Sequence, residues 1–150
     1  MNPTGRAILC GGFIAGTIDI GAAALINHLD PAMILHAIAS GVLGKAAFQG
    51  GAPAAWLGLG LQWAMSLLIA AIFAAAATRM AWLRGRWPLA GLAYGVAIYV
   101  VMNYLVVPLS AAPLKAPAAP VPVVLNLLAM LLFGLIVAFF ARRVRGIASY

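Results

Sequence analysis

The residue most able to do chemistry in this sequence is Asp19, an acid inside a long apolar run. A charged side chain at the centre of a bilayer costs about 2.5–3.5 kcal/mol on insertion scales. No basic residue lies beside Asp19 in this run to offset that cost. An acid in this position either relays protons or cations, or forms hydrogen bonds between helices, and both interpretations are open.

One or two polar side chains also occur in each of the other long apolar runs, and we expect them to turn toward Asp19. Residues three or four apart share one face of a helix. In each run the polar residue shares its face with small residues, which let neighbouring helices approach closely. The polar groups should therefore face the interior of a bundle rather than lipid. The predicted buried polar cluster consists of Asp19, Gln62, Tyr99, Asn103 and Asn126.

Glycines at helical spacing predict where the helices pack. Gly12 and Gly16 form one small-xxx-small pair, and Gly91 and Gly95 form another. This spacing is typical of helices whose backbones come into close contact in membranes. The glycines expected at helix contacts are Gly12, Gly16, Gly58, Gly91, Gly95 and Gly134.

The histidines are the remaining titratable candidates. His36 is a candidate titratable partner for Asp19 if the segment that carries it dips into the bundle. A metal site of His28, Asp30 and His36 is disfavoured, because a proline separates the two histidines and they do not share a helix face. A bis-histidine haem site is disfavoured because both histidines flank one loop. Cys10 is the only cysteine, so no cysteine-based metal site is expected. We predict no metal and no cofactor.

Catalysis is not expected from these residues. The sequence has no plausible Ser/His/Asp arrangement, no phosphate-binding loop and no metal motif. Asp19 and Asp30 are the only acids, so no span carries paired carboxylates. We therefore predict no catalytic residues and a protein that is not an enzyme.

The elements that must position these side chains are membrane helices. The chain is 66% hydrophobic and 7% charged, whereas a soluble domain is about half apolar and about a quarter charged. Four runs are near or above the roughly 20 residues that cross a bilayer, and only a helix satisfies the backbone of a lone segment in lipid. We predict an all-α membrane protein with a single transmembrane domain over residues 1–150. The four predicted spans cover residues 7–27, 53–78, 88–107 and 121–141.

A shorter helix is predicted between the first two spans, at about residues 31–48. Asp30 and Pro31 are typical of a helix start, and Gly50 and Gly51 are typical of a helix end. This segment is apolar but too short and too rich in glycine for a fifth span. We expect it to lie in the outer interface or to enter the bundle part way, as a re-entrant helix.

The basic residues predict the orientation of the chain. Seven of the nine fall on one side if the four spans alternate in direction, and only Lys45 and Lys115 fall on the other. Cytoplasmic loops carry the excess of Lys and Arg, so both termini should face the cytoplasm of a bacterial inner (plasma) membrane. The net charge of +7 is then explained by the basic residues that set the orientation of the spans in the membrane. Without a basic groove carrying interleaved aromatic residues, no nucleic-acid partner is predicted.

Three segments carry a resemblance to a known group of proteins. They read GGFIAGTIDI, ILHAIASGVLGKAAFQGG and YGVAIYVVMNYLVVPLS. In these segments the chain resembles small proteobacterial inner-membrane proteins that are distantly similar to the YagU-like family. The resemblance covers about residues 10–112 and implies an inner-membrane location, with no substrate or catalytic residue to carry over. Four helices with an acid in the first also resemble small multidrug transporters, in architecture only.

Two functions stay open from the sequence. The first is a structural or accessory subunit in the lipid bilayer that packs through glycine-rich helix faces, as a homo-oligomer or in a larger membrane complex. The alternative is a small transporter or proton- or cation-linked permease that uses buried Asp19 beside an outward-facing cavity. We favour the first, because 150 residues with one buried acid and no inverted repeat offer little for alternating access.

Overall fold

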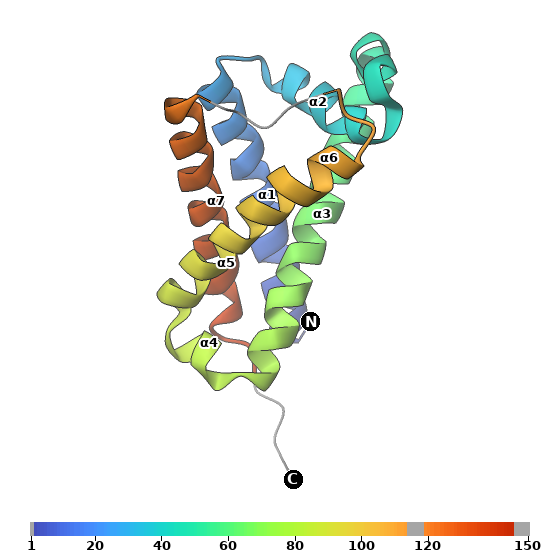
Figure 1. Ribbon diagram of the computed structural model, residues 1–150. Helices are drawn as coiled ribbons and strands as arrows, with labels where there is room; N and C mark the ends of the chain where they lie inside the picture. Colours follow the sequence, from blue (N-terminus) through green and yellow to red (C-terminus); the bar gives the residue numbers. More distant parts are fainter. Residues whose placement is uncertain (1, 114–118, 146–150) are drawn as a thin grey trace.

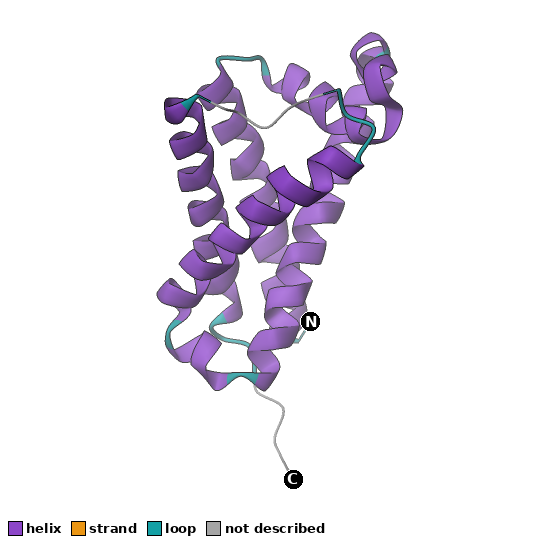
Figure 2. Cartoon of the chain, in the orientation of Figure 1, coloured by secondary structure: helices purple, strands orange, loops and turns teal. Residues whose placement is uncertain are grey.

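The computed structural model describes residues 2–113 and 119–145, which are helical apart from short loops and turns (Figures 1 and 2). No strand occurs in these residues, so the predicted all-α fold class is confirmed. The elements are α1 (Pro3–Asn27), α2 (Pro31–Leu43), the 3₁₀-helix η1 (Gly44–Gln49), α3 (Gly51–Arg79), α4 (Ala81–Gly85), α5 (Trp87–Val101), the π-helix η2 (Met102–Val106), α6 (Val107–Leu109) and α7 (Pro120–Ala141).

Five helical segments in the described part of the chain are long and apolar enough to cross a membrane. Four of them lie within a few residues of the predicted spans. The fifth, Pro31–Gln49, has the lowest mean hydropathy of the five, 1.3 against 2.8 for α7. By length and composition alone, five helical segments could cross a membrane. The arrangement of four spans with a shorter outer helix therefore stays a prediction.

The segment Pro31–Gln49 is not one straight helix. Asp30 caps its start, because its carboxylate accepts a hydrogen bond of 2.8 Å from the backbone of Ala32. Gly44 has a φ of 62°, a left-handed conformation that favours glycine, and there the α-helix ends and η1 begins. The 13 residues of α2 are roughly 20 Å long, shorter than the ~30 Å hydrocarbon layer. Figure 1 shows α2 lying across the upper end of the bundle.

The bundle core lies between α1, α3, α5 and α7. The most extensive contacts join α5 to α7, followed by α1 to α7 and α1 to α3. Most buried core residues are alanines, around a few larger side chains such as Phe73, Phe133 and Val137. In lipid no hydrophobic effect drives apolar helices together, so their association depends on van der Waals packing. Small side chains allow the helices to approach closely and so increase these contacts.

The third predicted span, residues 88–107, does not run as a regular α-helix to its end. The helix widens to a π-helix over Met102–Val106 before the short α6. Pro108 has no N–H group, so it cannot donate to the carbonyl four residues earlier, and a regular α-helical pattern cannot pass through it. Asn103 therefore lies in a π-helical segment, a form that is rare and often found at functional sites.

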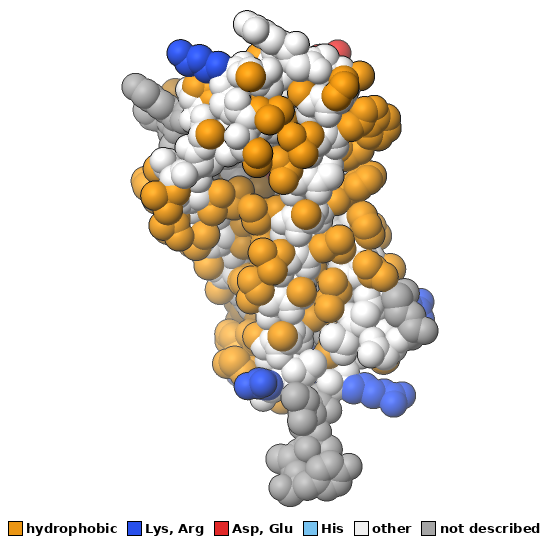
Figure 3. Space-filling model, turned by 90° about the vertical axis from the view of Figure 1, so that its right-hand side faces the viewer, with side chains coloured by type: hydrophobic (Ala, Val, Ile, Leu, Met, Phe, Trp, Pro, Cys, Tyr) orange, Lys and Arg blue, Asp and Glu red, His pale blue; other side chains and the backbone are white. Residues whose placement is uncertain are grey.

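The arginines gather at one end of the bundle. Figure 3 shows Lys and Arg side chains at the two ends of the molecule and hydrophobic side chains over the length between them. Lys45 lies in η1, at the upper end in Figure 1, and Lys115 lies outside the described residues. The arginines lie near the start of α1, around α4 and after α7, at the lower end, and are Arg6, Arg79, Arg84, Arg86, Arg142, Arg143 and Arg145.

Candidate functional site

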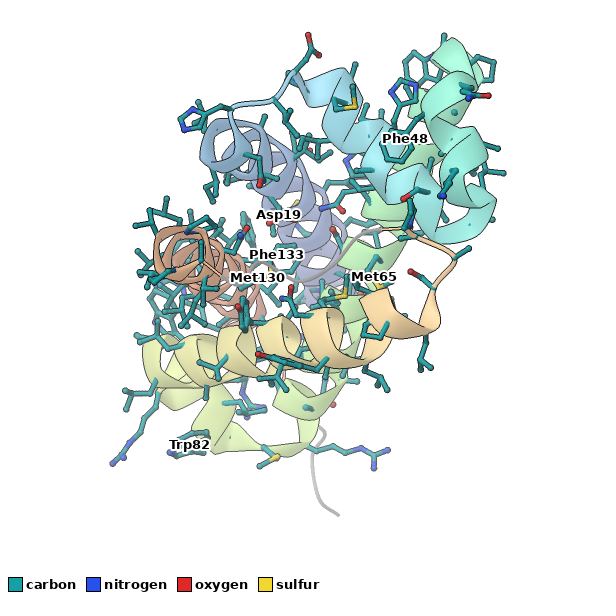
Figure 4. The ribbon with its side chains drawn as sticks, turned by 45° about the horizontal axis from the view of Figure 1, so that its top comes forward. Asp19, Phe48, Met65, Trp82, Met130 and Phe133 are labelled. Atoms are coloured by element: carbon teal, nitrogen blue, oxygen red, sulfur yellow. The ribbon has the colours of Figure 1, made fainter. Side chains whose placement is uncertain are left out.

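Asp19 and Gln62 meet at the contact between α1 and α3. The Nε2 atom of Gln62 donates a hydrogen bond of 2.9 Å to Oδ2 of Asp19, and the same atom lies 3.3 Å from the carbonyl oxygen of Gly16. Figure 4 shows Asp19 pointing into the interior of the bundle, where Met65, Met130 and Phe133 also point. Asp19 is half-buried rather than fully buried. Two of the five predicted polar residues are thus brought together, and their bond links two long helices.

Neighbouring residues hold this pair of helices in register. The buried hydroxyl of Ser66 donates 2.8 Å to the carbonyl of Gln62 and so stays within its own helix. A Cβ atom on Gly16 would overlap the side chain of Ser66, so glycine is needed for the close approach. Nε1 of Trp63 lies 3.2 Å from the hydroxyl of Thr17 and gives a second polar link between α1 and α3.

Among the described residues, a hydrogen bond joins two members of the predicted five-residue polar cluster, Asp19 and Gln62. Among the described residues no hydrogen bond joins Tyr99, Asn103 or Asn126 to Asp19. Nδ2 of Asn103 donates 2.9 Å to the carbonyl of Tyr99, and Nδ2 of Asn126 donates 2.8 Å to the carbonyl of Pro122. An amide side chain in a helix can reach the carbonyl one turn earlier, which satisfies a donor without a partner helix. All five predicted residues are half-buried.

His36 binds backbone rather than Asp19, which corrects the predicted titratable pair. Its Nδ1 lies 2.8 Å from the carbonyl of Ala32, and its Nε2 lies 2.9 Å from the carbonyl of Gly51. A neutral imidazole can donate to one of these carbonyls, and the doubly protonated ring can donate to both. The side chain therefore fastens α2 to the start of α3. In the described part of the chain no three His, Cys or acidic residues come together as metal ligands, and His28 is exposed.

The six glycines predicted to pack lie at helix–helix contacts within the chain. A Cβ on Gly12 would lie 2.8 Å from Cδ2 of Leu67, on α3. A Cβ on Gly95 would lie 2.8 Å from Cα of Leu131, on α7, and Gly91 and Gly134 meet at the same crossing. Gly58 packs in the same way on the backbone of α2, and Gly16 on α3. These faces are filled by the chain itself, so the idea that they receive a partner is corrected.

Tyr94 is a polar contact that the sequence reasoning missed. Its hydroxyl donates 2.8 Å to the carbonyl of Ile69, and its ring centre lies 5.0 Å from that of Phe73. These contacts join α5 to α3. A tyrosine hydroxyl inside an apolar helix needs a hydrogen-bond acceptor. The same reasoning that placed Tyr99 in the bundle interior would therefore have predicted an interior contact for Tyr94.

Two cavities lie at the arginine-bearing end of the bundle, away from Asp19. The larger has a volume of about 470 Å³ and opens between the start of α1 and the end of α7. The smaller, of about 300 Å³, is lined by apolar and aromatic residues of α1, α5 and α7. Neither is lined by Asp19 or Gln62. Sequence reasoning used the arginines here only for topology.

Comparisons with protein-family models, with curated proteins and with solved structures find no match to this chain. The resemblance to small proteobacterial inner-membrane proteins therefore stays a prediction. The functional argument rests on the geometry of the Asp19–Gln62 pair and of the arginine-bearing end.

Proposed function

We propose that the chain is a multi-pass protein of a bacterial inner membrane, with four spans and both ends in the cytoplasm. The spans are α1, α3, the segment from α5 to α6, and α7. The arginines at the end where α1 begins and α7 ends support this orientation, because cytoplasmic segments carry the excess of basic residues.

We further propose that α2 and η1 lie in the outer interface rather than forming a fifth span. The break at Gly44 and the short α-helical length support this placement. Two contacts hold the segment across the end of the bundle. One joins His36 to the carbonyl of Gly51, and the other is a 3.0 Å hydrogen bond from the backbone N–H of Ala111 to the carbonyl of Gly41.

The role we propose is structural or accessory, without catalysis. The observation that carries it is the double contact of Gln62, whose side-chain nitrogen lies within reach of both Asp19 and the backbone of Gly16. An acid in a proton or cation relay must exchange partners along its path. The acid here is tied to a helix contact, while Asn103 and Asn126 donate to their own helices. This arrangement suits interhelical hydrogen bonding better than transport.

A partner would dock on an outward face of the bundle, because the glycine faces are occupied. We propose the outer side of α5, η2 and α6, for a second copy or a larger membrane complex. The main contacts of η2 and α6 are with each other and with α5, not with the rest of the bundle. Tyr104 and Leu109 are 70% and 78% exposed there. Extraction in mild detergent, followed by identification of the species that copurify, tests this assignment.

Proton flux through reconstituted vesicles separates the structural role from transport. The wild-type chain, Asp19→Asn and Asp30→Asn are reconstituted with a pH-sensitive dye trapped inside. Asp30 is the matched control, since it is the only other acid and caps α2. The structural role predicts flux equal to that of empty vesicles for all three. Wild-type flux that Asp19→Asn abolishes and Asp30→Asn retains would overturn the proposal in favour of a permease.

A further inference from the structure

The two cavities at the arginine-bearing end adjoin each other and differ in chemistry. The larger is lined by four arginines: Arg6, Arg142, Arg143 and Arg145. The smaller is lined by apolar side chains, Ile14 and Leu135 among them. Phe139 and Phe140 line both, so the two spaces form one groove with a cationic end and an apolar end. The cationic space, of about 470 Å³, is partly enclosed, whereas the apolar space, of about 300 Å³, is an open hollow on the helix surface.

The cationic end of this groove has no acidic side chain of its own to balance it. The only acids in the sequence are Asp19, inside α1, and Asp30, at the opposite end of the bundle. Four guanidinium groups around one cavity make it strongly cationic, which attracts an anion. The planar guanidinium donates two parallel hydrogen bonds to phosphate oxygens, which makes arginine well suited to this anion.

Arg142 connects the two ends of the groove. Its Cζ lies 4.1 Å from the ring centre of Phe139 and 5.6 Å from that of Trp87. Trp87 and Phe139 both line the apolar cavity, and Arg142 lines the cationic one. The aromatic rings hold its half-buried side chain at the junction. A ligand with an anionic group joined to an apolar chain would therefore contact Arg142 and its supporting rings together.

We propose that this groove binds a membrane lipid with a phosphodiester headgroup. The phosphate contacts Arg6, Arg142 and Arg145, and an acyl chain lies along Ile14 and Leu135. Basic pockets between membrane helices on the cytoplasmic side are typical sites for anionic lipid headgroups. Free phosphate would use the cationic cavity alone and leave the apolar one unexplained. The assignment rests on the membrane placement proposed above.

Quenching of Trp87 by brominated lipid measures binding directly, since Trp87 lines the apolar cavity. The other three tryptophans, Trp56, Trp63 and Trp82, are changed to Phe in the full chain, which is reconstituted in nanodiscs. We expect brominated phosphatidylglycerol to quench Trp87 more strongly than brominated phosphatidylcholine at equal mole fraction. Each arginine that contacts the headgroup should contribute about a five-fold gain, taking the value of about 1 kcal/mol for a basic residue at an anionic surface. The double variant R6Q/R142Q should therefore weaken the preference roughly 25-fold.

The matched control is R79Q/R86Q, which removes two exposed arginines from the same end but outside the groove. It should keep the preference. A second variant, R6Q/R145Q, removes two exposed groove arginines and leaves the ring contacts of Arg142 intact, and it should lose the preference.

Three results would overturn the lipid assignment while the membrane placement stands. The first is equal quenching of Trp87 by both lipids. The second is a loss of the phosphatidylglycerol preference in R79Q/R86Q as large as that in R6Q/R142Q. The third is complete loss of the preference in excess inorganic phosphate, which would indicate that the site binds a soluble anion. A chain that does not enter nanodiscs would overturn both proposals.

Discussion

Replacing Gly134 with Ala is expected to force α7 away from α5. An added Cβ would meet the carbonyl of Gly91 and would lie 2.7 Å from the backbone nitrogen of Gly95 and 2.9 Å from its Cα. These are backbone atoms inside helices, which cannot turn aside as a flexible side chain can. Ordinary van der Waals contact begins at 3.4 Å, so relieving the contact with the nitrogen of Gly95 takes about 0.7 Å, and the closer contact with the carbonyl of Gly91 takes more.

The cost of this separation follows from the range of dispersion forces. A gap of about 0.5–1 Å forfeits roughly a quarter to a half of the attraction between the atoms that face it. The contact between α5 and α7 is the most extensive in the bundle, so many atoms are affected. Overpacking of a close contact typically costs about 1–3 kcal/mol. We expect Gly134→Ala to lower the free energy of unfolding by that amount.

Unfolding in mild detergent on addition of a denaturing detergent, followed by circular dichroism, measures this change. Gly60→Ala is the matched control, because a Cβ at Gly60 meets nothing within 4 Å and the residue also lies in a long apolar helix. The control should be at least as stable as the wild type, because alanine has a higher helix propensity than glycine. If Gly134→Ala matched the wild type, or if Gly60→Ala were equally destabilising, the reasoning on close packing would be refuted.

Three further substitutions test single contacts, the first two by the same unfolding measurement and the third by limited proteolysis. Gln62→Leu should cost about 0.6 kcal/mol, typical of interhelical hydrogen bonds in a membrane bundle, and should cost less when Asp19 is already Leu, because only the contact with Gly16 then remains to be lost; the same loss in both backgrounds would contradict their coupling. Tyr94→Phe should cost about 0.5–1.5 kcal/mol, because it loses its bond to Ile69 but keeps its ring contacts; unchanged stability would count against that bond. His36→Ala should speed proteolysis near η1, and cleavage at the wild-type rate would show that the histidine does not hold α2.

The helix ranges were predictable because apolar runs end at arginines, prolines and glycines. Asp19 and Gln62 were expected in one cluster because each shares its helix face with small residues, which let neighbouring helices approach closely. The partners of Asn103 and Asn126 did not follow, because each amide can bind a carbonyl of its own helix as readily as a neighbouring helix. Spacing along one helix cannot decide between these outcomes.

Glycine spacing predicted close packing but not the identity of the packed surface. Gly58 meets the backbone of Leu35 on α2, a helix expected either in the outer interface or entering the bundle part way. The arginine groove could not be predicted from the sequence either. Arg6 and Arg142 come together only because the start of α1 lies beside the end of α7. Such contacts join distant parts of the chain, and periodicity within one segment carries no information on them.

The central claim is a membrane-embedded bundle with its arginine-bearing end in the cytoplasm. Labelling of single cysteines in intact spheroplasts with a membrane-impermeant maleimide tests it, with Cys10 replaced by Ser. We predict that Lys45→Cys is labelled in intact spheroplasts, whereas Arg86→Cys is labelled only after the membrane is opened. Labelling of both positions from the outside, or of Arg86→Cys alone, would contradict the account.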